Sequence, residues 1–161
     1  TRCALVTGVQ TCALPICEIK RLEINYKTDE LFENFRAFGN KDLYMVNELN
    51  GQMIDASSDS PFYGIFVGDQ LGARMALLKK GDVEEIYFPD FEDYILLWKL
   101  EVLPKYQNRG YASELIDFAK SFNMPIKAIG RNDSKDFFLH HGFTDVEAKN
   151  IEGHDVLLWK P

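Results

Sequence analysis

Six residues at the start of an apolar helix, four in front of it and two in its first turn, are of the types that bind a phosphate group. The first turn of a helix has backbone N–H groups without partners and a partial positive charge, so a preceding turn can aim several donors at one anion. Gly110 has no Cβ and lets an anion approach the backbone, Ala112 keeps the next turn small, and Arg109 adds a positive charge. An anion site is therefore predicted, with an ordinary helix start as the alternative, at Gln107, Asn108, Arg109, Gly110, Tyr111 and Ala112.

Glu101 is the candidate general base, because it is the nearest carboxylate on the strand that leads to this turn. Lys99 shares its face of the strand two residues away, so a structural ion pair is the alternative role. His140 and His141 fall in a last helical turn, where a cation suits the helix dipole, and we expect them to be structural. No metal site is predicted from the three histidines.

The turn lies between two strands that must position it. Tyr94–Leu103 is a nearly continuous apolar run, typical of a strand buried on both faces, and it stops at Pro104. A helical stripe follows Gly110, and Met124–Gly130 reads as the next strand. These segments predict a β-α-β unit with parallel strands and a right-handed crossover.

The rest of the chain supplies elements on either side of this unit. We expect a strand over Glu18–Lys27, a helix capped at Thr28-Asp29-Glu30, and a second helix over Lys41–Ile54. A hairpin is predicted around Gly68-Asp69-Gln70. A short helix (133–141) and two strands (143–149 and 154–160) complete the order β-α-α-β-β-β-α-β-α-β-β.

Composition narrows the classes of partner. The 161 residues carry a net charge of −7, which argues against a general nucleic-acid binder, and no apolar run is long enough to predict a membrane span. The acidic stretch Gly81–Asp93, with Tyr87, Phe88 and Phe91, would attract a cationic amine or would simply be a solvated loop.

The first 17 residues differ in composition from the rest of the chain. They contain all three cysteines, Cys3, Cys12 and Cys17. The stretch "VTGVQTCALPI" resembles the conceptual translation of a sequencing adapter. We therefore expect residues 1–17 to be a non-native segment and residues 18–161 to form a single domain.

The stretch "LEVLPKYQNRGYASELIDFA" resembles the central motif of the GNAT superfamily of N-acetyltransferases. "INYKT", "SPFYGI", "WKLEVLP" and "AKSFNMPI" look similar to the bacterial YlbP group. The resemblance implies an α+β (mixed α/β) fold with a central mixed, mostly antiparallel sheet of about seven strands and helices on both faces. It also implies acetyl-CoA as co-substrate, its pyrophosphate on the amides of Gln107–Ala112 and its pantetheine arm on the backbone of Leu100 and Val102.

The chain departs from the second motif of the family. Counting back from Gly142-Phe143 puts Phe138 at the position of the family's tyrosine, where it has no proton for a leaving thiolate. Arg131 stands at the position of an asparagine of the family, with Asn132 one residue away, and Leu96 stands where some relatives carry a glutamate.

Two functions therefore remain open from the sequence. The first is direct acetyl transfer from acetyl-CoA to a primary amine of a small molecule or a protein. The second is a catalytically weak or inactive coenzyme A-binding sensor or interaction module. In either case we expect a cytoplasmic monomer or homodimer, with an amine acceptor that could be cationic and with no nucleic-acid or membrane partner.

Overall fold

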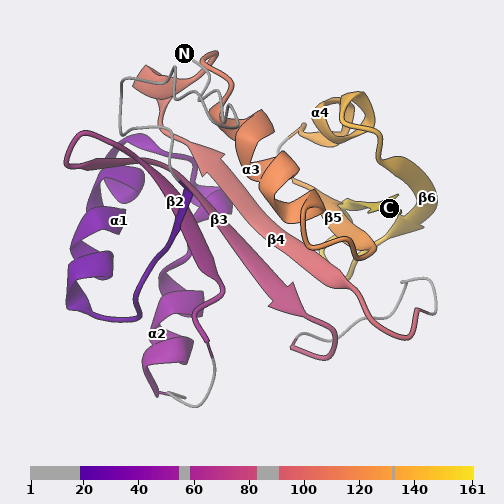
Figure 1. Cartoon of the computed structure of the whole chain (residues 1–161), viewed down its shortest axis with the longest axis horizontal. Coiled ribbons are helices and arrows are strands. Elements are labelled where there is room, and N and C mark those ends of the chain that lie inside the picture. The colour runs from indigo at the N-terminus through magenta and orange to yellow at the C-terminus, as the bar shows by residue number, and fades with distance from the viewer. Residues whose placement is uncertain (1–18, 55–58, 83–90, 132) are drawn as a thin grey trace, which may run out of the picture. The chain divides into compact units, whose positions relative to one another are not determined.

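The element order of the computed structural model is the order predicted from the sequence (Figure 1). Seven strands follow one another in the sheet as β1-β2-β3-β4-β5-β7-β6, mostly antiparallel, which confirms the predicted fold class. The elements are β1 (Ile19–Arg21), α1 (Tyr26–Phe38), α2 (Val46–Ile54), β2 (Phe62–Val67), β3 (Gln70–Lys79), β4 (Ile95–Val102), α3 (Tyr111–Lys120), β5 (Ile126–Gly130), α4 (Lys135–His140), β6 (Thr144–Lys149) and β7 (Asp155–Trp159). Two short 3-10 helices are η2 (Lys41–Leu43) and η3 (Pro104–Tyr106).

The structure describes residues 19–54, 59–82, 91–131 and 133–161. Four features of the sequence lie outside these ranges: the 17-residue N-terminal segment, Glu18, Asn132, and residues 83–90 of the acidic stretch with Tyr87 and Phe88. Within the described ranges, no helix combines the length and the hydropathy needed to cross a membrane.

The chain divides into two compact units, and the single-domain expectation stays a prediction. Unit 1 comprises Thr1–Met75 and Leu100–Leu115, and unit 2 comprises Ala76–Lys99 and Ile116–Pro161. The strands β3 and β4 and the helix α3 each continue from one unit into the other.

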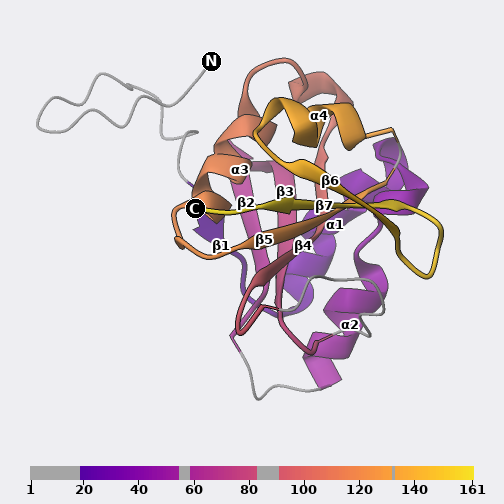
Figure 2. The ribbon, with the colours of Figure 1, turned by 90° about the vertical axis from the view of Figure 1, so that its right-hand side faces the viewer.

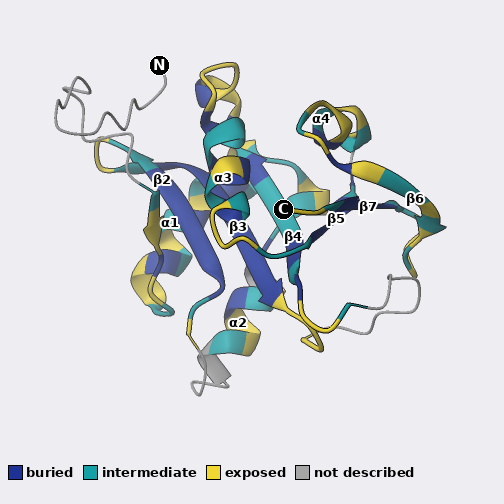
Figure 3. Cartoon of the chain, turned by 45° about the vertical axis from the view of Figure 1, so that its right-hand side comes forward, coloured by how far each residue is buried: buried dark blue, intermediate teal, exposed yellow. Residues whose placement is uncertain are grey.

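In unit 1, α1 packs on the sheet through aromatic side chains. Phe32 and Phe62 are fully buried, with their ring centroids 5.8 Å apart in an edge-to-face contact. The strand β2 pairs antiparallel with β1, and Figure 3 shows most of β2 as buried. The face of α1 that carries Phe32 therefore packs against β2.

The first strand is shorter than the alternating pattern predicts. It ends at Arg21, and α1 begins at Tyr26 because the Asn25 side chain accepts a hydrogen bond from the N–H of Thr28 (3.0 Å). Asn25 is therefore the helix cap, whereas we expected it at Thr28–Glu30. The predicted second helix is also divided, since η2 precedes α2 and begins where the Asn40 side chain accepts the N–H of Asp42 (2.9 Å).

In unit 2, β4 and β5 are parallel as predicted, with Ile95 opposite Ile126. The strand β5 pairs antiparallel with β7, which pairs with β6, and α4 contacts all three of these strands (Figure 2). Leu96 and Leu97, on opposite faces of β4, are both buried, as expected for a strand covered on two sides. The core of this unit gathers Leu78, Leu96, Ile129 and Val156, with Trp98 and Val146 packed against it.

Candidate active site

The predicted anion turn lies in unit 1, between η3 and the start of α3. Asn108 and Gly110 have positive φ values of 63° and 85°, so two residues of the turn are left-handed before the helix begins at Tyr111. The side chains of Gln107, Asn108 and Arg109 are exposed, and a Cβ built on Gly110 would meet no atom within 4 Å. The backbone is therefore open to a ligand on this side, and the positive φ of Gly110 strains any other residue.

Tyr106 anchors the turn to β3. Its buried ring donates a hydrogen bond through its hydroxyl to Oε1 of Gln70 (2.7 Å). The guanidinium carbon of Arg109 lies 5.6 Å from the centroid of the same ring, and Lys105 Nζ lies 4.9 Å from it. Two positive charges are thus held beside the turn, where they favour an anion.

The two residues after Gly110 play different parts. Tyr111 is 1% exposed, and within the described residues its buried hydroxyl has no hydrogen-bond partner. Its side chain is therefore a core anchor, and only its backbone belongs to the turn. Ala112 is half-buried on the first turn of α3.

The end of β4 leads into the turn. Leu100 and Val102 are half-buried and point to one face of the strand, while Glu101 points to the other. The side-chain amide of Gln107 donates to the carbonyl of Val102 (3.2 Å), which links the strand end to the turn. Strand alternation therefore separates the carboxylate from the side chains of its two neighbours.

Glu101 is buried, and both of its carboxylate oxygens have partners. Oε2 accepts the backbone N–H of Asn40 (2.5 Å), and Oε1 lies 3.4 Å from Nη2 of Arg74. The ion pair that the structure shows therefore joins Glu101 to Arg74 rather than to Lys99. Burial raises the pKa of Glu101, and the Asn40 N–H and the charge of Arg74 oppose this shift only in part.

Arg74 is the charged residue inside the apolar run "LGARMALL". Its guanidinium lies between the rings of Phe32 and Phe35, 4.3 Å from each centroid, and donates to the carbonyl of Leu43 (3.3 Å). Burial lowers its pKa to about 10, although Glu101 opposes this shift. Sequence reasoning missed Arg74, but a lone arginine in an apolar strand is the signal that could have found it.

Arg131 is in unit 2, directly after β5. Its guanidinium stacks 4.4 Å from the Trp98 ring centroid, while Nε donates to the carbonyl of Trp98 (3.3 Å) and Nη1 pairs with Glu152 (3.0 Å). Among the described residues, its buried Nη2 has no hydrogen-bond partner. Arg131 thus ties the β6–β7 turn to the end of β5.

Phe138, also in unit 2, is 4% exposed and packs against the rings of Phe137 and Phe143. Its ring therefore belongs to an aromatic cluster that extends from α4 to Phe143. Unit 1 thus holds the turn together with Leu100, Glu101 and Val102. Unit 2 holds Arg131 and Phe138, and Asn132 lies outside the described residues.

His141 follows the last turn of α4, where we expected a histidine cation. Burial and the nearby Lys120 lower the pKa of His141, which favours its neutral form. Lys120 provides the positive charge instead, since its Nζ donates to the carbonyl of His141 (2.5 Å). Among the residues that the structure describes, no three His, Cys, Asp or Glu side chains form a metal-binding group.

The fold is that of an α+β protein of the acetyltransferase type, and comparisons with known proteins agree. No family model matches the chain. An uncharacterised N-acetyltransferase of Staphylococcus haemolyticus is 74% identical over 89% of this chain and 98% of its own length. One of Bacillus licheniformis is 46% identical over 89% of this chain and 92% of its own length.

A solved structure is similar as well. The N-acetyltransferase YlbP of Bacillus subtilis, determined in complex with coenzyme A, is 46% identical, with a TM-score of 0.67. The match covers 89% of this chain and 96% of that one. The chain therefore belongs to the GNAT superfamily of N-acetyltransferases, in the group that includes YlbP.

Proposed function

We propose that this chain is an acetyl-CoA-dependent N-acetyltransferase that moves the acetyl group directly to a primary amine of a small molecule or a protein. The observation that carries this proposal is the exposed turn at Gln107–Ala112, with its open Gly110, in front of α3. The coenzyme A in the structure of the YlbP relative supports it.

The backbone N–H groups from Gln107 to Ala112 hold the pyrophosphate, and Arg109 adds a charge. Leu100 and Val102 offer backbone hydrogen bonds to the pantetheine arm. This assignment fits the geometry of the turn, since a Cβ on Gly110 would point into open space and a ten-residue helix begins at the next residue.

Acetyl-CoA supplies the acetyl group as a thioester, and the amine nitrogen must attack its carbonyl carbon in the neutral form. A bond from nitrogen to carbon forms, the carbon–sulfur bond breaks, and the amine loses one proton. We assign that proton to Glu101 through a water molecule. Burial raises the pKa of Glu101, which brings a carboxylate closer to the range of a useful base at neutral pH.

The second motif supports binding rather than proton transfer. Arg131, Asn132 and Phe138 are proposed as further coenzyme-binding residues, with Phe138 as an apolar contact. Since a phenyl ring has no proton to donate, the coenzyme A thiolate takes its proton from elsewhere.

One alternative has an observation in its favour. Phe138 has no hydroxyl, and both oxygens of Glu101 already have partners. A coenzyme A-binding sensor or interaction module with weak or no turnover would have these properties. For either function we propose a cytoplasmic monomer or homodimer, and the net charge of −7 favours a cationic amine as the acceptor.

Binding and turnover are measured separately. Acetyl-CoA should raise the melting temperature, since a ligand at a hundred times its Kd stabilises by about 2.7 kcal/mol. Gly110→Asp should abolish this shift by placing a carboxylate at the phosphate site. Gly153→Asp is the matched control, because Gly153 has a φ of 86° and is equally open but lies in the β6–β7 turn.

If both variants lose the shift in melting temperature, or if both keep it, the phosphate does not bind at this turn. Release of coenzyme A thiol with a panel of amines, with and without acetyl-CoA, then separates the two functions. Thiol release above the amine-free rate supports the transferase, and binding without release across the panel supports the binding module.

A further inference from the structure

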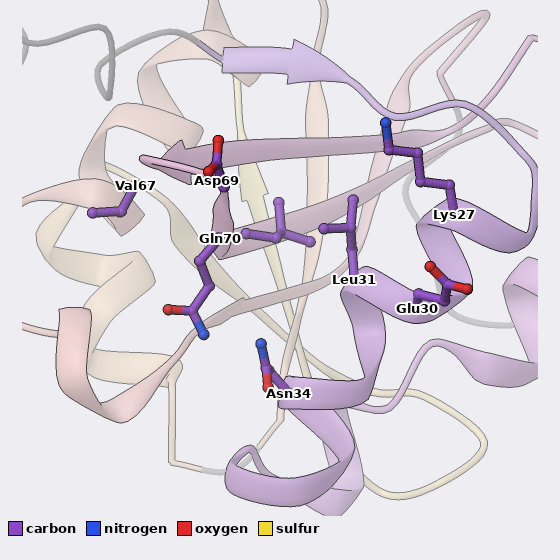
Figure 4. Close-up of a pocket in the computed structure, with 8 residues that line it drawn as sticks. Lys27, Glu30, Leu31, Asn34, Val67, Asp69 and Gln70 are labelled. Carbon is purple, nitrogen blue, oxygen red and sulfur yellow. The ribbon is translucent and has the colours of Figure 1, made fainter.

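A cavity of about 470 Å³ that is open to solvent lies in unit 1, between α1 and the β2–β3 turn (Figure 4). This volume is within the range of small-molecule sites. Its lining residues are Lys27, Glu30, Leu31, Asn34, Val67, Asp69, Gln70 and Leu71. None of them has a part in the transfer reaction proposed above.

The lining has a clear order along α1. Lys27, Glu30, Leu31 and Asn34 are spaced i, i+3, i+4 and i+7, so they share one face of the helix. At 1.5 Å of rise per residue, Lys27 and Asn34 are about 10 Å apart along the axis. The cavity therefore has a charged end at Lys27 and Glu30, an apolar middle at Leu31, and a carboxamide end at Asn34.

At the carboxamide end, Figure 4 shows the side chains of Asn34 and Gln70 pointing toward one another. Oε1 of Gln70 already accepts a hydrogen bond from the hydroxyl of Tyr106 (2.7 Å). The amide N–H groups of Gln70 can therefore donate to a ligand. This end therefore suits a ligand that presents a carbonyl oxygen.

Charge selects among such ligands. Lys27 can pair with a carboxylate and Glu30 with an ammonium group, which together match the head of a free α-amino acid. Asp69 adds a second negative charge to the lining, so a side chain that ends in a neutral carboxamide suits the cavity better than one that ends in a carboxylate.

We propose that this cavity is an effector site for a free amino acid with a carboxamide side chain, with L-glutamine as the probe. Lys27 and Glu30 hold its α-carboxylate and α-ammonium groups, Leu31 and Leu71 contact its methylene groups, and Asn34 and Gln70 bind its amide.

The site is coupled to the coenzyme turn through one hydrogen bond. Gln70 lines the cavity and holds the hydroxyl of Tyr106, whose ring carries Arg109 on the turn. A ligand that moves Gln70 therefore changes the position of the turn. This coupling rests on the proposed function, and by linkage coenzyme A and glutamine must alter each other's affinity by the same factor.

Calorimetry on the full chain tests the cavity first without coenzyme A. L-glutamine should bind, L-glutamate should bind more weakly, and Asn34→Ala should weaken glutamine binding about tenfold, as for loss of a hydrogen bond near 1.4 kcal/mol. Glu33→Gln is the control, because Glu33 is exposed on α1 outside the cavity lining. No heat at millimolar glutamine, or equal affinity in Asn34→Ala and the parent chain, overturns the proposal.

The coupling is tested with Tyr106→Phe, which keeps the ring and removes the hydroxyl. Glutamine should change the Kd of coenzyme A about fivefold or more in the parent chain and less in this variant. If glutamine binds and coenzyme A does not, the proposal of a glutamine site stands and the proposed acetyltransferase function is wrong. Mass-spectrometric detection of N-acetylglutamine as a product would overturn the effector role.

Discussion

Arg74 and Glu101 form an ion pair inside unit 1, with 3.4 Å between Nη2 and Oε1 and side chains that are 1% and 5% exposed. The pair connects the middle of β3 to the end of β4, and the Asn40 N–H on Oε2 extends it to the segment between α1 and η2. Burying two charges has a desolvation cost that their attraction offsets only in good geometry.

A double-mutant cycle measures this relationship. Arg74→Met leaves the Glu101 carboxylate buried without its partner and should lower the free energy of unfolding by about 3–5 kcal/mol. Adding Glu101→Gln should recover most of that loss, because no charge then remains buried. Urea unfolding of the parent, the two single variants and the double variant gives the coupling energy. Losses that simply add would show that the pair is not an energetic unit.

Stability should depend on pH through Glu101. Its folded-state pKa is raised above 4.5, so the folded state holds this proton more tightly than the unfolded chain does. Its contribution is therefore fully present below about pH 4.5 and is lost as the pH rises through the raised pKa. The stability of the parent chain relative to Glu101→Gln should fall over that window and then level off. A difference that rises with pH would contradict the raised pKa.

Turnover tests the role of Glu101 as a base. Glu101→Gln should lower the rate of thiol release by about a hundredfold to ten-thousandfold and leave the Kd of acetyl-CoA nearly unchanged. The assay is run at a temperature where circular dichroism shows the variant to be folded. Unaltered turnover together with reduced stability would assign Glu101 to the ion pair alone.

Gly39 tests how closely the chain approaches Glu101. A Cβ at this position would lie 2.6 Å from Glu101 Oε2 and 2.4 Å from the Phe35 carbonyl oxygen. Gly39→Ala should therefore lower the free energy of unfolding by about 1–3 kcal/mol, as overpacking does. Gly51→Ala is the matched control on α2, where a Cβ meets no atom within 4 Å, and it should raise stability by up to about 1 kcal/mol. Equal effects of the two changes would exclude this close approach.

The sequence by itself determined the order of the elements and the location of the turn. These features depend on neighbouring residues: Pro104 ends a strand, Gly110 permits a positive φ, and apolar residues at helical spacing come after it. Such local signals act over a few residues, and the structure reproduces them at the end of β4 and the start of α3.

Only the tertiary structure decided which groups surround Glu101 and where the first strand ends. Arg74 is 27 residues from Glu101 and Asn40 is 61 residues from it, so spacing along the chain could not pair them, and Lys99 looked like the natural partner. The alternating pattern continues to Tyr26, but Tyr26 is 81% exposed because the Asn25 cap starts α1 there. Burial and long-range pairing depend on which elements pack together. Local patterns in a single sequence do not show that packing, which is known only once the chain has folded.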